Sequence, residues 1–127
     1  MSSELIASCF RDILQASNLI AAWVKEAGSA QKAILEDVKA RSAIERQFLV
    51  ISEAATRLHK HDPTVGEQLA PDLDWPGIRG IGNFIRHRYD DLDTAILVDV
   101  IDNRLATLRE ACQRTLDRLA PDPSESG

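Results

Sequence analysis

The chain has 127 residues, of which 44% are hydrophobic and 28% charged, and its net charge is −5 at pH 7. This length predicts one domain with a substantial buried core. No apolar run approaches the roughly 18 residues that span a membrane, and the N-terminus lacks a signal-peptide pattern. We therefore expect a cytoplasmic protein that does not contact a membrane. Scarce aromatic residues and abundant Ala, Leu, Ile, Arg and Glu favour helices over sheets.

The first half of the chain predicts two long helices around a short one. A helix over residues 3–27 has Ser3 as a plausible N-cap and ends at Gly28. A short helix over 29–36 follows, with a bend near Asp37. The apolar stripe of the first helix is Ile6, Cys9, Phe10, Ile13, Ser17, Ile20 and Val24.

The second long helix is predicted over residues 37–60. Pro63 cannot continue it, which places His59 and His61 in a polar exit turn. Its apolar stripe follows a nearly seven-residue repeat and consists of Ile44, Phe48, Ile51, Ala55 and Leu58.

At most two turns of helix over residues 64–70 follow, with Thr64 available as a cap. Asp74 is a natural N-cap for the next helix, over residues 75–89, and Pro76 occupies its favoured first turn.

The last helix is expected to start near Asp93, as its N-cap, and to be followed by a Pro/Ser/Glu-rich, disordered tail over 121–127. These elements predict an all-α bundle of about five to six helices in one domain over residues 1–120. The apolar positions of the last helix are Ile96, Leu97, Val100, Ile101, Leu105, Leu108, Cys112, Leu116 and Leu119.

The two cysteines, Cys9 and Cys112, lie in apolar stripes and are predicted to be reduced core residues. The histidines and cysteines show no paired metal-ligand spacing, apart from His59 and His61, which are two residues apart. We therefore expect no structural metal, and nothing in the sequence implies a cofactor.

The stretch DWPGIRGIGNFIRHRYDDLD, residues 74–93, stands out by charge. Three arginines and a histidine but no acid lie between Arg79 and Arg88, a local charge of +3 in an acidic chain. Such a concentration is typical of a site for a phosphate or another anion. The alternative is an arginine-rich helix face that pairs with surface carboxylates.

A helical wheel separates this stretch into two sides. Arg79, Asn83 and His87 form a polar ladder at intervals of four residues, with Arg86 beside it. Tyr89 projects towards the apolar side if the helix stays regular. The residues expected on the buried side are Ile78, Ile81, Ile85 and Leu92.

Glycines at 77, 80 and 82 each cost the helix about 1 kcal/mol relative to Ala. We therefore expect a close approach of another backbone or of a ligand. Gly80 and Gly82 are not a dinucleotide fingerprint, because no strand precedes them. A histidine, a guanidinium and an amide together can cleave an RNA phosphodiester without metal, using the 2′-hydroxyl as nucleophile. A plain interaction surface is the alternative.

The motif RGIGNFIRHRYDDLD resembles the signature of the HepT-like toxins of the HEPN fold, and the resemblance extends over residues 8–119. It implies an all-α homodimer that acts as a metal-independent ribonuclease. It also implies neutralisation by a cognate minimal nucleotidyltransferase antitoxin, which can adenylylate the motif tyrosine.

By this resemblance His87 matches the catalytic histidine and Tyr89 the motif tyrosine, which is also the possible modification target. Asn83 matches the polar residue that usually follows the family's arginine and is our candidate to orient the phosphate, and Arg88 is a further candidate for substrate binding. In the family's pattern, four to six residues separate the catalytic arginine from the histidine. This chain has Gly80, Ile81 and Gly82 at those positions, which leaves Arg79 or Arg86 as the catalytic arginine.

The helix over 37–60 carries a second matching segment. Glu53 matches the acid of the family's Gly-Glu-Ala segment, and Ser52 replaces its glycine. An ordinary salt bridge is the alternative role for Glu53.

The leading hypothesis is a HepT-like endoribonuclease toxin. The alternative is a catalytically inactive HEPN module that binds a nucleotidyltransferase partner or a nucleotide. A third interpretation, favoured by the acidic pI of about 5.1, is a helical adaptor without a nucleic-acid role.

Overall fold

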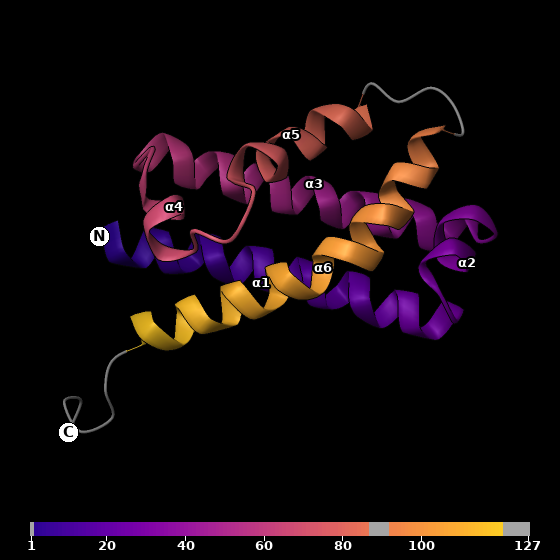
Figure 1. Cartoon of the computed structure of the whole chain (residues 1–127), viewed down its shortest axis with the longest axis horizontal. Helices are drawn as coiled ribbons and strands as arrows, with labels where there is room; N and C mark the ends of the chain where they lie inside the picture. Colours follow the sequence, from indigo (N-terminus) through magenta and orange to yellow (C-terminus); the bar gives the residue numbers. More distant parts are fainter. Residues whose placement is uncertain (1, 87–91, 121–127) are drawn as a thin grey trace.

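The structure is a computed structural model that describes residues 2–86 and 92–120. This part of the chain contains helices and no strands, which confirms the predicted all-α bundle (Figure 1). The helices of the described residues are α1 (Ser2–Ala27), α2 (Ala30–Leu35), α3 (Val38–His61), α4 (Val65–Leu69), α5 (Trp75–Arg86) and α6 (Leu92–Leu119).

The long helices α1 and α3 pack along each other, and α6 crosses them (Figure 1). Their predicted apolar stripes meet in one core, which the sequence periodicity located correctly. Within the last helix the prediction was too generous, because Ile96 is 48% exposed. The largest fully buried side chains include Trp75, Phe10, Phe48, Ile13, Ile20, Ile34, Ile44, Ile51, Leu58 and Leu97.

Short-range signals set most helix ends. Gly28 has φ 104°, a left-handed conformation that ends α1 without steric cost. Ser29 accepts a hydrogen bond from the Lys32 amide and caps α2. Asp37 accepts one from the Ala40 amide and caps α3.

Three cap predictions differ from the structure. Ser3 lies inside α1, which begins at Ser2, rather than at its N-cap. Thr64 precedes α4 but makes no side-chain capping bond, because its hydroxyl is instead within hydrogen-bond distance of Asp62 and Gln68. Helix α6 begins at Leu92, so Asp93 lies inside the helix rather than at its N-cap. A cap residue whose side chain finds another partner cannot be distinguished by sequence alone.

Both cysteines are free and fully buried, as predicted. Burial raises the pKa of Cys112 to about 12, and burial also raises the pKa of Cys9, which the neighbouring Arg57 partly opposes. Neither thiol therefore forms appreciable thiolate at neutral pH. No helix of the described residues is long and apolar enough to cross a membrane.

Candidate functional site

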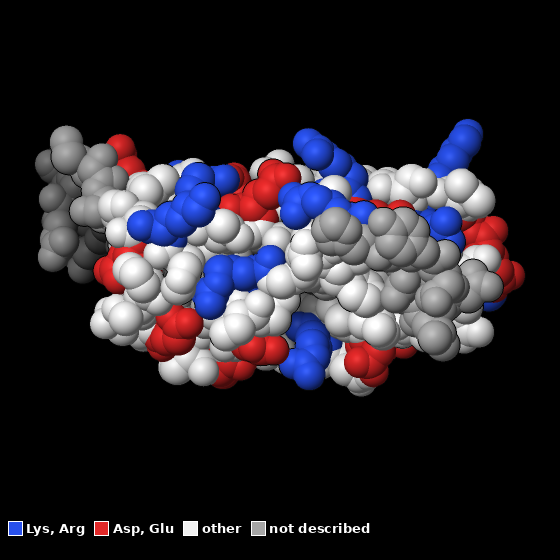
Figure 2. All heavy atoms as spheres, turned by 90° about the horizontal axis from the view of Figure 1, so that it is seen from above, with Lys and Arg blue, Asp and Glu red and all other residues white. Residues whose placement is uncertain are grey.

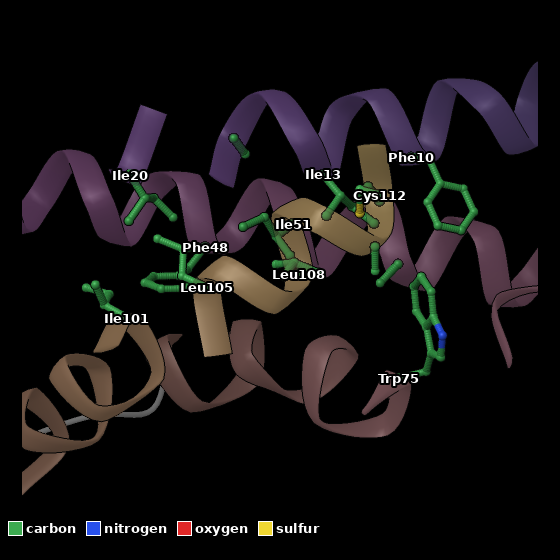
Figure 3. Packing of buried hydrophobic residues seen from close by; sticks show 14 of the residues in the cluster. Phe10, Ile13, Ile20, Phe48, Ile51, Trp75, Ile101, Leu105, Leu108 and Cys112 are labelled. Carbon is green, nitrogen blue, oxygen red and sulfur yellow. The ribbon is translucent and has the colours of Figure 1, made fainter. Parts of the chain in front are cut away.

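Helix α5, which contains most of the sequence motif, is anchored to the core at its first residue. Trp75 is 1% exposed and donates a hydrogen bond from Nε1 to the Ala70 carbonyl at 3.0 Å. Its ring meets Phe10 of α1 edge-on, with centroids 5.7 Å apart (Figure 3). A Cβ on Gly66 would lie 2.9 Å from the indole, so glycine there leaves room for the ring. These contacts fix where α5 begins.

Asp74 caps this helix, as the sequence predicted. Its Oδ1 accepts a hydrogen bond from the Gly77 amide at 3.2 Å. A Cβ on Gly77 would collide with the same carboxylate. The first glycine of the motif therefore serves the cap.

The isoleucine side of α5 is only half-buried. Ile78 and Ile81 pack against the core but also line a groove of about 330 Å³ between α3, α5 and α6. Phe48 and Ile51 of α3 form part of its apolar lining. The wheel correctly paired these isoleucines with the core, but α5 and α6 diverge, as Figure 1 shows, so this side stays partly open.

The other side of α5 meets α3 at two small residues. Ser52 of α3 is 4% exposed, and its hydroxyl donates a 2.6 Å hydrogen bond to the Arg79 carbonyl. Gly82 is buried opposite it, and a Cβ there would lie 2.6 Å from Ser52 Oγ and 3.0 Å from Ser52 Cβ. A close approach thus occurs at Gly82, but the neighbour is the Ser52 side chain rather than the expected backbone or ligand, and a Cβ on Gly80 would meet nothing within 4 Å.

Arg86, at the end of α5, reaches back over this contact. Its Nη2 lies 3.7 Å from Glu53 Oε1, with both side chains about half exposed. Its Nη1 lies 3.3 Å from the position of a Cβ on Gly82. Glu53 therefore forms the salt bridge that was the alternative to its family-matched role, and this ion pair joins the two motif segments of the sequence.

Arg79 and Asn83 differ in their surroundings. Asn83 is exposed on the last turns of α5. Arg79 is half-buried and lines a small recess together with His59 and Trp75. His59 lies in the last turn of α3 rather than in an exit turn, and its buried Nδ1 has no hydrogen-bond partner.

Three candidate residues, His87, Arg88 and Tyr89, lie outside the described residues, as does the tail over 121–127. Helix α5 ends at Arg86, immediately before them in sequence. Figure 2 shows the side of the molecule that is uppermost in Figure 1, with basic side chains interspersed with acidic ones. This face therefore is not uniformly basic.

Ser52 and Gly82 each stand out in the sequence, but their contact with each other was not predicted. Periodicity places Ser52 beside the core stripe of α3, yet it does not pair two small residues 30 positions apart. Within the described residues, no group of three or more His, Cys, Asp and Glu side chains comes together as a metal site. The polar end of α5 therefore offers an amide, a guanidinium and a neighbouring carboxylate.

Comparison with protein families gives one match. The family described as "Ribonuclease HepT-like" matches residues 13–115, which include α3, α4, α5 and most of α6. No curated protein and no solved structure matches the chain.

Proposed function

Because the chain belongs to the HepT-like ribonuclease family, we propose that it is the endoribonuclease toxin of a toxin–antitoxin system. One observation carries this proposal. Exposed Asn83 and half-exposed Arg86 stand together on the last turns of a firmly anchored helix, directly before the His87-Arg88-Tyr89 segment. Polar groups that can bind a phosphate therefore adjoin a histidine that can move protons.

The proposed reaction is attack by the ribose 2′-hydroxyl on the adjacent phosphorus. His87 takes the proton of the 2′-hydroxyl as general base, and the bond from phosphorus to the 5′-oxygen breaks. The protonated His87 then acts as general acid and returns this proton to the leaving 5′-oxygen, and the other product ends in a 2′,3′-cyclic phosphate. No bound metal is needed to supply the nucleophile, since the RNA contains it.

An arginine of α5, Arg79 or Arg86, stabilises the charge that develops on the phosphoryl oxygens. Asn83 orients the phosphate by a hydrogen bond from its amide. Arg88 and Tyr89 contact the substrate, and Tyr89 is also the residue that a nucleotidyltransferase antitoxin would adenylylate. We propose that the toxin is a cytoplasmic homodimer with this antitoxin as its cognate partner.

The test is RNA cleavage by purified protein in the presence of EDTA. We expect cleavage that leaves cyclic-phosphate ends, and we expect His87→Ala to abolish both cleavage and the growth defect on expression. Intact RNA with the wild-type protein, together with a growth defect that His87→Ala does not relieve, would overturn the enzyme proposal.

A second candidate is an inactive HEPN module that only binds a nucleotidyltransferase or a nucleotide. The observation that favours it is Gly82, which stands at one of the positions of the family's arginine and has no room for a side chain. This candidate predicts no toxicity, and partner binding that survives His87→Ala.

A further inference from the structure

Two departures of this chain from the family pattern, Ser52 and Gly82, form one contact. Ser52 is almost completely buried and bonds the Arg79 carbonyl at 2.6 Å. Any side chain at residue 82 would start 2.6 Å from Ser52 Oγ and 3.0 Å from Ser52 Cβ. Ser52 therefore excludes an arginine at residue 82, because the hydroxyl would have to give up its hydrogen bond and the helices would have to separate.

The guanidinium of Arg86 lies close to Gly82, on the side where a side chain at residue 82 would begin. Side chains on a helix lean towards its N-terminus, so a long side chain at residue 86 lies above residue 82. The observed distance of 3.3 Å from Arg86 Nη1 to the site of a Gly82 Cβ fits this geometry. Because Gly82 has no side chain, the Arg86 guanidinium has room to lie near Glu53, the acid that matches the family's Gly-Glu-Ala segment.

Glu53 holds Arg86 weakly. The two groups are 3.7 Å apart and have exposed fractions of 52% and 54%, in the range where ion pairs contribute little. A phosphate can replace such a carboxylate at low cost, since a guanidinium binds phosphate by paired hydrogen bonds.

Arg79 is placed differently. It is half-buried and is one of the residues that line the recess near Trp75 and His59, at the anchored end of α5. In the sequence it stands eight residues before His87, whereas Arg86 is the immediate neighbour of His87.

We infer that Arg86, and not Arg79, is the arginine that contacts the RNA phosphate, and that Ser52 is the positioning residue that makes this arrangement possible. The inference rests on the proposed function for its substrate, and it resolves which arginine serves the site. Arg86 lies one helical turn after residue 82, which is one of the positions of the family's arginine, and Ser52 occupies the space that a side chain at residue 82 would need.

Moving the arginine from residue 86 to residue 82 tests this inference in the full-length protein. We expect Arg86→Ala to lower the cleavage rate of a single-stranded RNA by about 100-fold, as for the loss of one charge-stabilising group. Arg79→Ala is expected to lower it far less. Gly82→Arg/Arg86→Ala should stay as inactive as Arg86→Ala, and adding Ser52→Gly should recover at least about tenfold of the rate.

Three results would overturn the inference: an equal or greater loss with Arg79→Ala, full recovery with Ser52 still in place, or a folded triple variant without recovery. Thermal unfolding provides a readout independent of activity. Gly82→Arg/Arg86→Ala should melt about 5 °C or more below Arg86→Ala, and Ser52→Gly should restore the melting temperature. A melting temperature that Ser52→Gly does not restore contradicts the contact itself.

An RNA-binding measurement distinguishes failure of the proposed function from failure of this inference. If the wild type cleaves no RNA, the same variants are compared by binding of a fluorescent single-stranded RNA. Weaker binding by Arg86→Ala and its recovery in the triple variant would still support the phosphate contact. Equal binding by all variants would overturn it.

Discussion

The two ends of α5 differ in almost every physical respect. At the first residue, Trp75 is buried against Phe10 and hydrogen-bonded to the Ala70 carbonyl. At the last turns, Asn83 is exposed and Arg86 forms a loose ion pair with Glu53. Between them, the Ser52–Gly82 contact fixes the distance from α3.

This difference shows how a short helix can present weakly held polar groups in a defined place. The anchored beginning supplies the orientation, so the end does not need strong contacts of its own. A guanidinium in a weak ion pair remains available for a substrate, whereas one buried in a strong pair would not. Substitutions at the two ends should therefore affect different properties, stability at the start and RNA cleavage at the end.

The largest expected effect is the loss of the anchor. Trp75→Ala should lower the free energy of unfolding by about 3–5 kcal/mol, because it removes a fully buried indole and leaves a cavity. Trp23→Ala, at a half-buried position of α1, is the matched control and should cost less. Chemical denaturation measures both. A Trp75 variant that is no less stable than the Trp23 variant would mean that α5 is not anchored at its start.

The next effect separates two glycines two residues apart. Gly82→Ala should lower the free energy of unfolding by about 1–2 kcal/mol, because the clash with Ser52 exceeds the helix-propensity gain of about 1 kcal/mol. Gly80→Ala meets nothing within 4 Å and should instead stabilise the protein by up to about 1 kcal/mol. Denaturation midpoints of the two variants should move in opposite directions, and a Gly82→Ala protein as stable as the wild type or more stable would contradict the packing at Gly82.

The sequence predicted the anchored end of α5 better than the polar end. Hydrophobic periodicity identified the helices and the core of α1 and α3, since each stripe is a property of one segment. The cap at Asp74 was also local, because it depends on a side chain and an amide three residues apart. Signals of this kind lie within one short segment, so they can be identified from a single sequence.

The contacts of the polar end join residues that are distant in sequence, and this is why they were missed. Nothing in the spacing of α3 or of α5 states that Ser52 faces Gly82, or that Glu53 reaches Arg86. The helical wheel placed Arg79 on one face with Asn83, but in the folded protein Arg79 is one of the residues that line a small recess with His59. Whether Arg79 or Arg86 is free to bind an anion depends on that packing. The sequence alone could therefore only name both as candidates.

At the polar end, Asn83→Ala should affect cleavage and not stability. We expect the cleavage rate to fall about tenfold, equivalent to about 1.4 kcal/mol, because an orienting amide is lost. The free energy of unfolding should stay within about 0.5 kcal/mol, as is usual for exposed positions. Gln31→Ala, an exposed amide on α2, is the control that should change neither quantity. A large loss of stability in the Asn83 variant would show that this end is structural as well.

The smallest expected effect concerns the cap at the start of the same helix. Asp74→Ala should lower the free energy of unfolding by about 1 kcal/mol, because the Gly77 amide loses its partner. Asp74→Asn should retain most of this stability, since asparagine caps equally well. Asp37→Ala, which removes the corresponding bond at the start of α3, provides a cap of the same chemistry on a longer helix. RNA cleavage by the Asp74→Ala protein, measured well below its melting temperature, should equal that of the wild type. If cleavage instead falls with the cap while the protein stays folded, the start of α5 controls the position of Arg86 directly, and the two ends act as one unit.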